Sequence, residues 1–138
     1  MVLGKQRRRL YLQIALVVIG ILFLLLYPLM QLWPSGWLWL PRQPEYEQMM
    51  IGVYATLGIF LILASRRPEQ HLSLIWFTFW SSLVHGMIMG VQAILDPREH
   101  AHLIGDVAAL FIAVLLFGWL TPRRRFKEPP VREPTEHQ

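Results

Sequence analysis

Polar side chains recur at helical spacing within an otherwise apolar stretch of the chain. Between Glu69 and Asp96 they are separated by four, three, four, three and four residues: Thr78, Ser82, His85, Met89, Gln92 and Asp96. This spacing places them on one face of a helix. An unsatisfied polar group in lipid is costly, so their alignment predicts that this face points into the protein.

Two other segments carry carboxylates and histidines at similar spacing. Glu99, His102 and Asp106 lie three and four residues apart on a second helical face, and Tyr54 lies seven residues after Glu47. Their positions predict a polar pocket that opens at the outer end of a helical bundle and narrows inwards. The predicted ligand-binding residues are His85, Gln92, Tyr54, Asp106, Glu47 and His102.

Each of these residues also has a structural explanation. His85 could be satisfied by a hydrogen bond to a neighbouring helix, and Asp106 by a hydrogen bond to Gln92. Helix N-termini favour carboxylates, and loop ends often hold solvated histidines. These two explanations apply to Glu47, Glu99, His100 and His102.

Metal or cofactor chemistry has weak support in the sequence. His102 and Asp106 could share an ion with Glu47 or Glu99, but the His-Glu-x-x-His signature is absent. A Cu(I) path would use thioethers, which are equally typical of core packing: Met49, Met50, Met87 and Met89. The absence of Cys excludes thiolate sites. A haem with two histidine ligands would need a second histidine at the depth of His85. We predict no metal site, and the cofactor stays unknown.

The composition indicates that these faces belong to membrane helices. The 138 residues are 54% hydrophobic and 16% charged, which is too apolar for an ordinary soluble domain. Four long stretches lack formal charge or nearly so, and about 20 apolar residues suffice to cross a bilayer. We predict an all-α polytopic membrane protein, an up-down four-helix bundle with spans at about 10–32, 48–65, 72–95 and 103–120. A basic segment (1–9) precedes this transmembrane domain (10–120), and a disordered tail (121–138) follows it. A cleaved signal peptide is disfavoured, because the first apolar run exceeds the usual length.

The distribution of Lys and Arg predicts the orientation. Of the 13 Lys and Arg residues, all but Arg42 and Arg98 lie in the two terminal segments or the second connection. The positive-inside rule therefore places both termini in the cytoplasm, in a multi-pass protein of the cell inner membrane. We expect the aromatic first connection, residues 33–41, to lie flat in the outer interface. The basic ends favour anionic lipid of the inner leaflet over nucleic acid as their partner.

Small residues predict where two of the helices meet. Gly86 and Gly90 in the third span lie at the same estimated depths as Ala113 and Ala109 in the fourth. Small residues let membrane helices approach closely. We therefore expect these two pairs to form a packed seam.

Three short segments resemble a known family. Residues 47–50 with Tyr54, residues 80–85 and residues 102–106 are similar to a family of small bacterial four-helix membrane proteins of unknown function. The resemblance covers about 12–120 and implies the fold and the membrane location. It implies no activity and no catalytic residue.

Three functions compete at this stage. The leading hypothesis is a non-enzymatic membrane protein, either an accessory subunit bound to a membrane-protein partner or another copy, or a module that binds a small ligand in the outer pocket. The alternatives are a small transporter or proton relay that uses His85, and a metal- or cofactor-dependent redox enzyme.

Overall fold

The computed structural model describes residues 2–39 and 43–122, and these residues fold into helices without any strand. The predicted all-α class is confirmed. Four long helices, two short ones and two 3-10 helices follow in the order α1 (Val2–Leu24), α2 (Leu26–Leu32), α3 (Pro34–Trp37), α4 (Pro44–Ala64), η1 (Pro68–Gln70), α5 (Leu72–Leu95), η2 (Pro97–Leu103) and α6 (Asp106–Leu120). Arg42 and most of the predicted tail lie outside the described residues.

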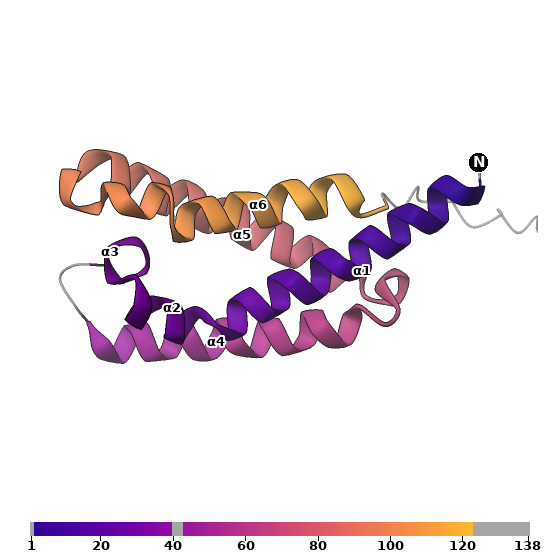
Figure 1. Ribbon diagram of the computed structural model, residues 1–138, viewed down its shortest axis with the longest axis horizontal. Helices are drawn as coiled ribbons and strands as arrows, with labels where there is room; N and C mark the ends of the chain where they lie inside the picture. Colours follow the sequence, from indigo (N-terminus) through magenta and orange to yellow (C-terminus); the bar gives the residue numbers. More distant parts are fainter. Residues whose placement is uncertain (1, 40–42, 123–138) are drawn as a thin grey trace, which may run out of the picture.

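The long helices run up and down along one axis, so that the start of α1 and the end of α6 lie at the same end of the molecule (Figure 1). We call this the terminal end, and the opposite end, which holds α2, α3 and η2, the loop end. The helix α4, the helix α5 and the segment Pro97–Leu120 are each long and apolar enough to cross a membrane. A fourth span results if the bent pair α1 and α2 counts as one.

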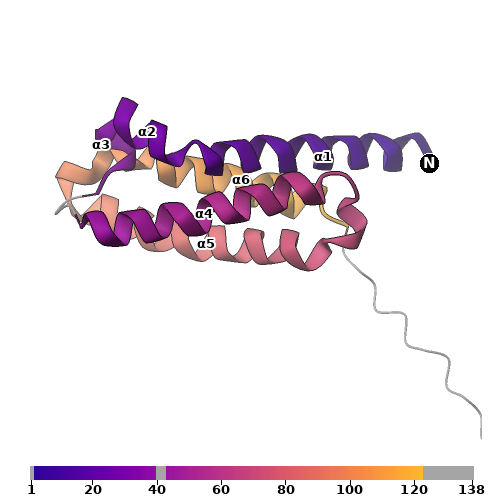
Figure 2. The same cartoon turned by 90° about the horizontal axis from the view of Figure 1, so that it is seen from below.

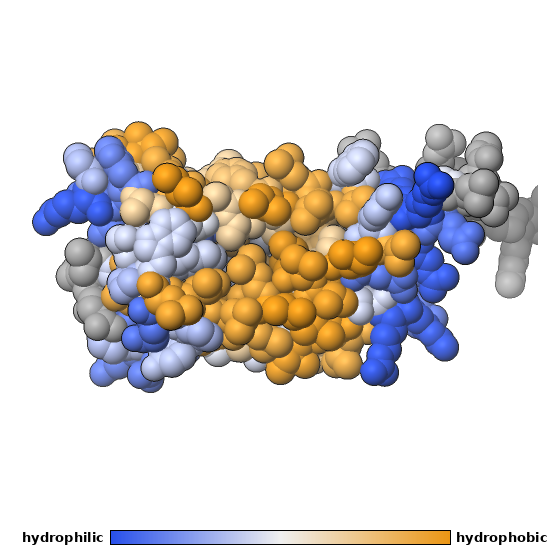
Figure 3. Space-filling model, viewed as in Figure 1, coloured by the Kyte–Doolittle hydropathy of each residue, from blue (hydrophilic) through white to orange (hydrophobic). Residues whose placement is uncertain are grey.

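The surface has the polarity that such a crossing needs. A broad apolar band covers the middle of the molecule, and hydrophilic residues gather towards both ends, most densely at the terminal end (Figure 3). Large apolar side chains are exposed on three of the long helices, among them Val53 on α4, Phe77 on α5 and Leu115 on α6. Soluble monomers rarely expose so large a continuous apolar surface.

The first predicted span differs from the structure in its start and its course. The helix α1 begins at Val2, well before the predicted start at residue 10, so the basic residues belong to it, and its first turns extend beyond the other helices (Figure 2). It then breaks at Leu25, and α2 continues at an angle of 57°. Pro28 explains the break, because a proline ring clashes with the carbonyl four residues earlier, here that of Leu24.

The helix α5 covers Leu72–Leu95, which are the bounds predicted for the third apolar segment. It ends there because Pro97 disfavours helical backbone at Asp96, which is extended. The helix α4 begins four residues before the predicted start, with Pro44 in its first turn. The last α-helix begins at Asp106, because the residues before it form the 3-10 helix η2.

The packing of the helices departs from the predicted up-down bundle at one consecutive pair, α4 and α5. The helix α1 packs on α4 and on α6, and α6 packs on α5, whereas α4 and α5 make few direct contacts. A short connection holds α4 and α5 together at the terminal end, where Leu61 and Ile75 share the main core. Towards the loop end the two helices diverge, and this divergence provides the space for a cavity.

The long helices α1 and α4 approach each other closely at two glycines. A Cβ atom added to Gly58 would lie 2.6 Å from the carbonyl oxygen of Gly20, and one added to Gly20 would lie 2.7 Å from that of Gly58. Such distances are too short for any side chain, so both positions require glycine. This crossing is absent from the sequence-based prediction.

The predicted seam between the third and fourth spans needs correction in its register. The helices α5 and α6 do pack together, but Gly86 faces Leu110 and Phe111, and Gly90 faces Val107. The predicted partners, Ala113 and Ala109, are therefore not the residues that meet them. At Gly90 an added Cβ would find one atom, 3.7 Å away, which is ordinary van der Waals contact.

Arg8, on α1, contacts the C-terminal end of α6. Its guanidinium donates hydrogen bonds to the carbonyl oxygens of Trp119, Leu120 and Thr121, at 2.9, 3.0 and 3.1 Å. The last carbonyls of a helix have no partner within it and carry partial negative charge, which a cation stabilises. Arg8 therefore caps α6.

Replacement of Arg8 by methionine is expected to lower the unfolding temperature in detergent. Hydrogen bonds from charged donors contribute about 1.5 to 3 kcal/mol each. Because Arg8 is exposed to water, we expect the total loss of unfolding free energy to lie near the lower value. Arg7→Met is the matched control, because Arg7 makes no hydrogen bond or ion pair in the described part of the chain. Equal shifts in the two variants would show that charge alone matters at this end.

Candidate functional site

A cavity of about 390 Å³ lies between α4 and α5 towards the loop end of the molecule. The helices α1, α2 and α6 and the segment around α3 complete its walls. Most of the lining is apolar. Of the six predicted site residues, five line this one cavity: Tyr54, His85, Gln92, Asp106 and Glu47. Helical spacing and depth thus predicted which side chains come together, and the structure adds the shape of the space they share.

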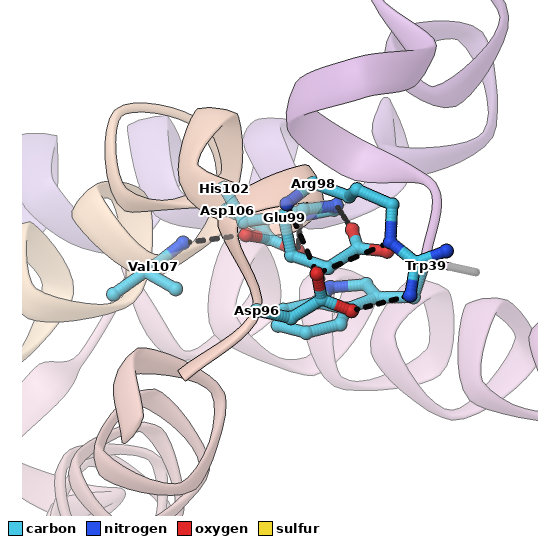
Figure 4. Close-up of polar contacts among 7 residues, drawn as sticks. All are labelled: Trp39, Asp96, Arg98, Glu99, His102, Asp106 and Val107. Atoms are coloured by element: carbon cyan, nitrogen blue, oxygen red, sulfur yellow. Dashed lines mark hydrogen bonds and ion pairs between the residues drawn. The ribbon is translucent and has the colours of Figure 1, made fainter. Parts of the chain in front are cut away.

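Asp106, in the first turn of α6, is the most highly connected of these residues (Figure 4). Its Oδ2 accepts a hydrogen bond from Nε1 of Trp39 at 2.9 Å and lies 3.0 Å from Nδ1 of His102. Its Oδ1 accepts a hydrogen bond from the backbone N–H of Val107 at 2.8 Å. The proposed hydrogen bond to Gln92 is not among these contacts. Two donors, the indole of Trp39 and the backbone of Val107, together with the imidazole of His102, hold the carboxyl group at the cavity wall.

His102 does not line the cavity, and the explanation of it as a solvated loop-end residue is wrong, because its side chain is fully buried. The imidazole lies between two carboxylates: Nδ1 faces Asp106, and Nε2 lies 3.1 Å from Oε2 of Glu99. Glu99 is also buried. His100, in contrast, is exposed, as that explanation predicts.

The contacts of His102 determine where protons must lie in this cluster. An ionised carboxylate only accepts hydrogen bonds, and a neutral imidazole donates one. Each N···O contact therefore needs a proton on the imidazole or on the carboxyl group. The hydrogen bond to Asp106 reaches the cavity wall, whereas Nε2 lies beside Glu99 as an ion-pair contact and has no hydrogen-bond partner in the described structure.

Trp39 is the functional residue that the sequence analysis missed. Its indole hydrogen-bonds Asp106 and stacks on the imidazole of His102, with ring centroids 4.2 Å apart. The first connection carries it there because α3 packs against η2, where Gly36 and Gly105 meet backbone to backbone. The prediction treated Trp39 as an interfacial ring. Asp106, at the start of an apolar span and with Gln92 as its one proposed partner, was the signal that could have indicated it.

His85 and Tyr54 form the deeper part of the cavity wall. The two rings meet edge to face with centroids 5.8 Å apart, and Tyr54 packs in the same way on Phe23 at 4.9 Å. Within the described residues, His85 makes no hydrogen bond. The interhelical hydrogen bond proposed as its structural role is therefore not observed.

The remaining residues of the polar face of α5 differ in how far they are buried. Thr78, Ser82 and Met89 are buried, as an inward face requires, and Thr78 donates to the carbonyl oxygen of Leu74 at 2.9 Å. Gln92 lines the cavity but is largely exposed.

Asp96 caps η2 instead of entering the cavity, and its Oδ1 accepts the N–H of Arg98 at 3.0 Å. This backbone hydrogen bond, together with the Arg98 side chain, lowers the pKa of Asp96.

Glu47 serves the start of α4. Its Oε1 accepts a hydrogen bond from the backbone N–H of Gln43 at 3.3 Å, so it satisfies the N–H of the residue that precedes the helix. The explanation of Glu47 as a helix-terminal carboxylate is therefore confirmed. The same residue lines the cavity.

The donor atoms do not converge in the manner of a metal centre. Within residues 2–39 and 43–122, no group of three or more His, Asp or Glu side chains could hold an ion. His102 and Asp106, proposed as a ligand pair, bind each other instead. Of the four methionines proposed for Cu(I), Met50 and Met89 line the cavity, whereas Met49 and Met87 are exposed outside it.

Fold and site together define a small all-α protein with apolar helices of membrane-spanning length and a cavity whose mostly apolar wall carries a few polar groups. The chain belongs to a family of unknown function (DUF6632), whose model matches residues 8–133. The predicted resemblance to an uncharacterised family is confirmed. No curated protein and no solved structure matches the chain.

Proposed function

We propose that the chain is a multi-pass protein of the cell inner membrane that binds a small ligand in the cavity between α4 and α5. The cavity carries this proposal. Its volume of about 390 Å³ falls within the range of about 300 to 1,000 Å³ for small-molecule sites. Its wall is apolar with a few polar groups on α4, α5 and α6, which is the usual composition of such a site.

Four spans with both termini in the cytoplasm complete the proposal. The start of α1 and the end of α6 lie at one end (Figure 1), and the positive-inside rule assigns that end to the cytoplasm. Reporter fusions after Arg125 should then behave as cytoplasmic, and fusions near Arg42 as exported. An exported C-terminus would contradict the four-span arrangement.

Filling the cavity tests ligand binding directly. Ala109 lines the cavity on α6, so Ala109→Phe should occupy part of its volume. Ile112→Phe is the matched control, because Ile112 is exposed on the same helix. We expect native mass spectrometry of gently extracted protein to show a bound small molecule on the wild type and on Ile112→Phe, and a loss of it on Ala109→Phe. A wild type without bound mass, unaffected in stability by any member of a ligand library, would contradict the proposal.

A proton relay is the second candidate, and the observation that favours it is the buried His102, whose imidazole lies 3.1 Å from Glu99 and 3.0 Å from Asp106. The relay would run through His102 and not through His85, which lacks hydrogen-bond partners in the described residues. Reconstituted protein should then transport protons into liposomes, and His102→Leu should abolish this flux while His100→Leu preserves it. Absence of flux from the wild type would exclude this role.

A further inference from the structure

The charged groups of the cavity wall are all of one kind. Glu47 on α4 and Asp106 on α6 both line it, and no lysine or arginine is among its described lining residues. A cavity with acidic groups and low-dielectric walls concentrates negative potential. An anionic ligand would therefore be repelled, and a cationic group would be attracted.

Aromatic rings make up much of the same wall. They come from α1, from the segment around α3 and from α4: Phe23, Trp37, Trp39, Tyr46 and Tyr54. The face of an aromatic ring attracts a cation by about 0.5 to 2 kcal/mol, most strongly where water is excluded. Rings combined with carboxylates are the usual chemistry for recognising substituted ammonium groups.

The position of Asp106 links these two features. The indole of Trp39 both lines the cavity and donates to Oδ2, so a ring and a carboxylate stand side by side. Oδ1 accepts a single bond, from Val107, in the described structure. A carboxylate oxygen has room for a second donor.

We infer that the ligand of this cavity is an organic ammonium ion with an apolar body, whose charged head lies between Glu47, Asp106 and the indole of Trp39. This inference rests on the proposed function and specifies its ligand class. The volume admits one ring or a short chain with its head. The ammonium could belong to a free amine or to the headgroup of a phospholipid, and both share the same recognition.

Two probes of equal shape separate charge from size. Benzyltrimethylammonium carries a permanent positive charge, and neopentylbenzene is its neutral carbon isostere. Calorimetric titration of the full chain in dodecyl maltoside, which contains no ammonium group, should give at least tenfold tighter binding of the cation. Equal affinities would overturn the inference.

Three variants locate the charge effect. Glu47→Gln and Asp106→Asn each retain an acceptor oxygen but lose the charge, so each should weaken binding of the cation by about tenfold and leave the neutral probe unaffected. Glu45→Gln is the matched control, because Glu45 lies in the same first turn and does not line the cavity. Retained binding of the neutral probe shows that the variants are folded. Unchanged preference for the cation in both test variants would overturn the inference.

The outcomes distinguish this inference from the proposed function. If both probes bind equally and Ala109→Phe removes both, the cavity binds ligands without selecting cations, and the proposed function alone survives. If neither probe binds, the inference is overturned. The proposed function is tested separately, by whether native mass spectrometry shows a small molecule bound to the extracted protein. Displacement of benzyltrimethylammonium by dihexanoylphosphatidylcholine would identify a lipid headgroup as the source, and no displacement would identify a free amine.

Discussion

An alanine at Gly58 is expected to lower the free energy of unfolding by about 1 to 3 kcal/mol, the usual cost of overpacking. The added Cβ would lie 2.6 Å from the carbonyl oxygen of Gly20. Because the neighbour is backbone, it cannot rotate away, and α1 and α4 must separate. Alanine favours helical backbone over glycine by up to about 1 kcal/mol, which offsets part of the cost.

Gly90→Ala is the matched control for this prediction. Both residues lie inside long apolar helices, but the Cβ at Gly90 would meet one atom, of Val107, at an ordinary 3.7 Å. Thermal unfolding in detergent should therefore show a clear loss for Gly58→Ala and little change for Gly90→Ala. The reverse order would mean that the α5–α6 seam, as predicted from the sequence, is the closer crossing.

The sequence predicted the long helices and five of the residues that line the cavity for a simple reason. The length of an uncharged stretch and the spacing of its polar residues are local properties, so the bounds of α5 were predicted to the residue, and Thr78, Ser82 and Met89 of its polar face were assigned correctly to the interior. Estimated depth then placed Tyr54, His85 and Asp106 at overlapping levels, and they line the same cavity.

The register between α5 and α6 could not be obtained in the same way. The depth estimate counted the rise of an α-helix, about 1.5 Å per residue, from the predicted start of the fourth span at residue 103. The chain has already turned back along α5 before that residue, because Pro97–Leu103 form a 3-10 helix that packs against α5. A given depth on α6 is therefore reached earlier in the sequence, so Val107 and Leu110 stand where Ala109 and Ala113 were expected.

Which helices pack against each other, and which residues Trp39 contacts, are determined by tertiary structure. A short connection brings two helices together at one end only, so it does not prevent α4 and α5 from diverging at the other. Trp39 reaches Asp106 because Gly36 and Gly105 permit contact between backbones 69 residues apart in the sequence. No periodic pattern records such a contact, since neither glycine lies on a repeating face.

Replacement of His102 by leucine is expected to have the largest effect of any single change at the site. The imidazole is fully buried and touches Asp106 and Glu99, which are themselves buried. Leucine removes both contacts and supplies no donor. Loss of one partner of a buried ion pair costs about 3 to 5 kcal/mol, because the remaining charge keeps its desolvation penalty.

His100→Leu is the matched control, since His100 lies two residues earlier in the same 3-10 helix and is exposed. Its unfolding temperature should equal that of the wild type. His102→Gln, which offers a donor to one carboxylate, should fall between the two leucine variants. If His102→Leu unfolds at the wild-type temperature, the contacts of His102 with Glu99 and Asp106 do not stabilise the fold, and this prediction is wrong.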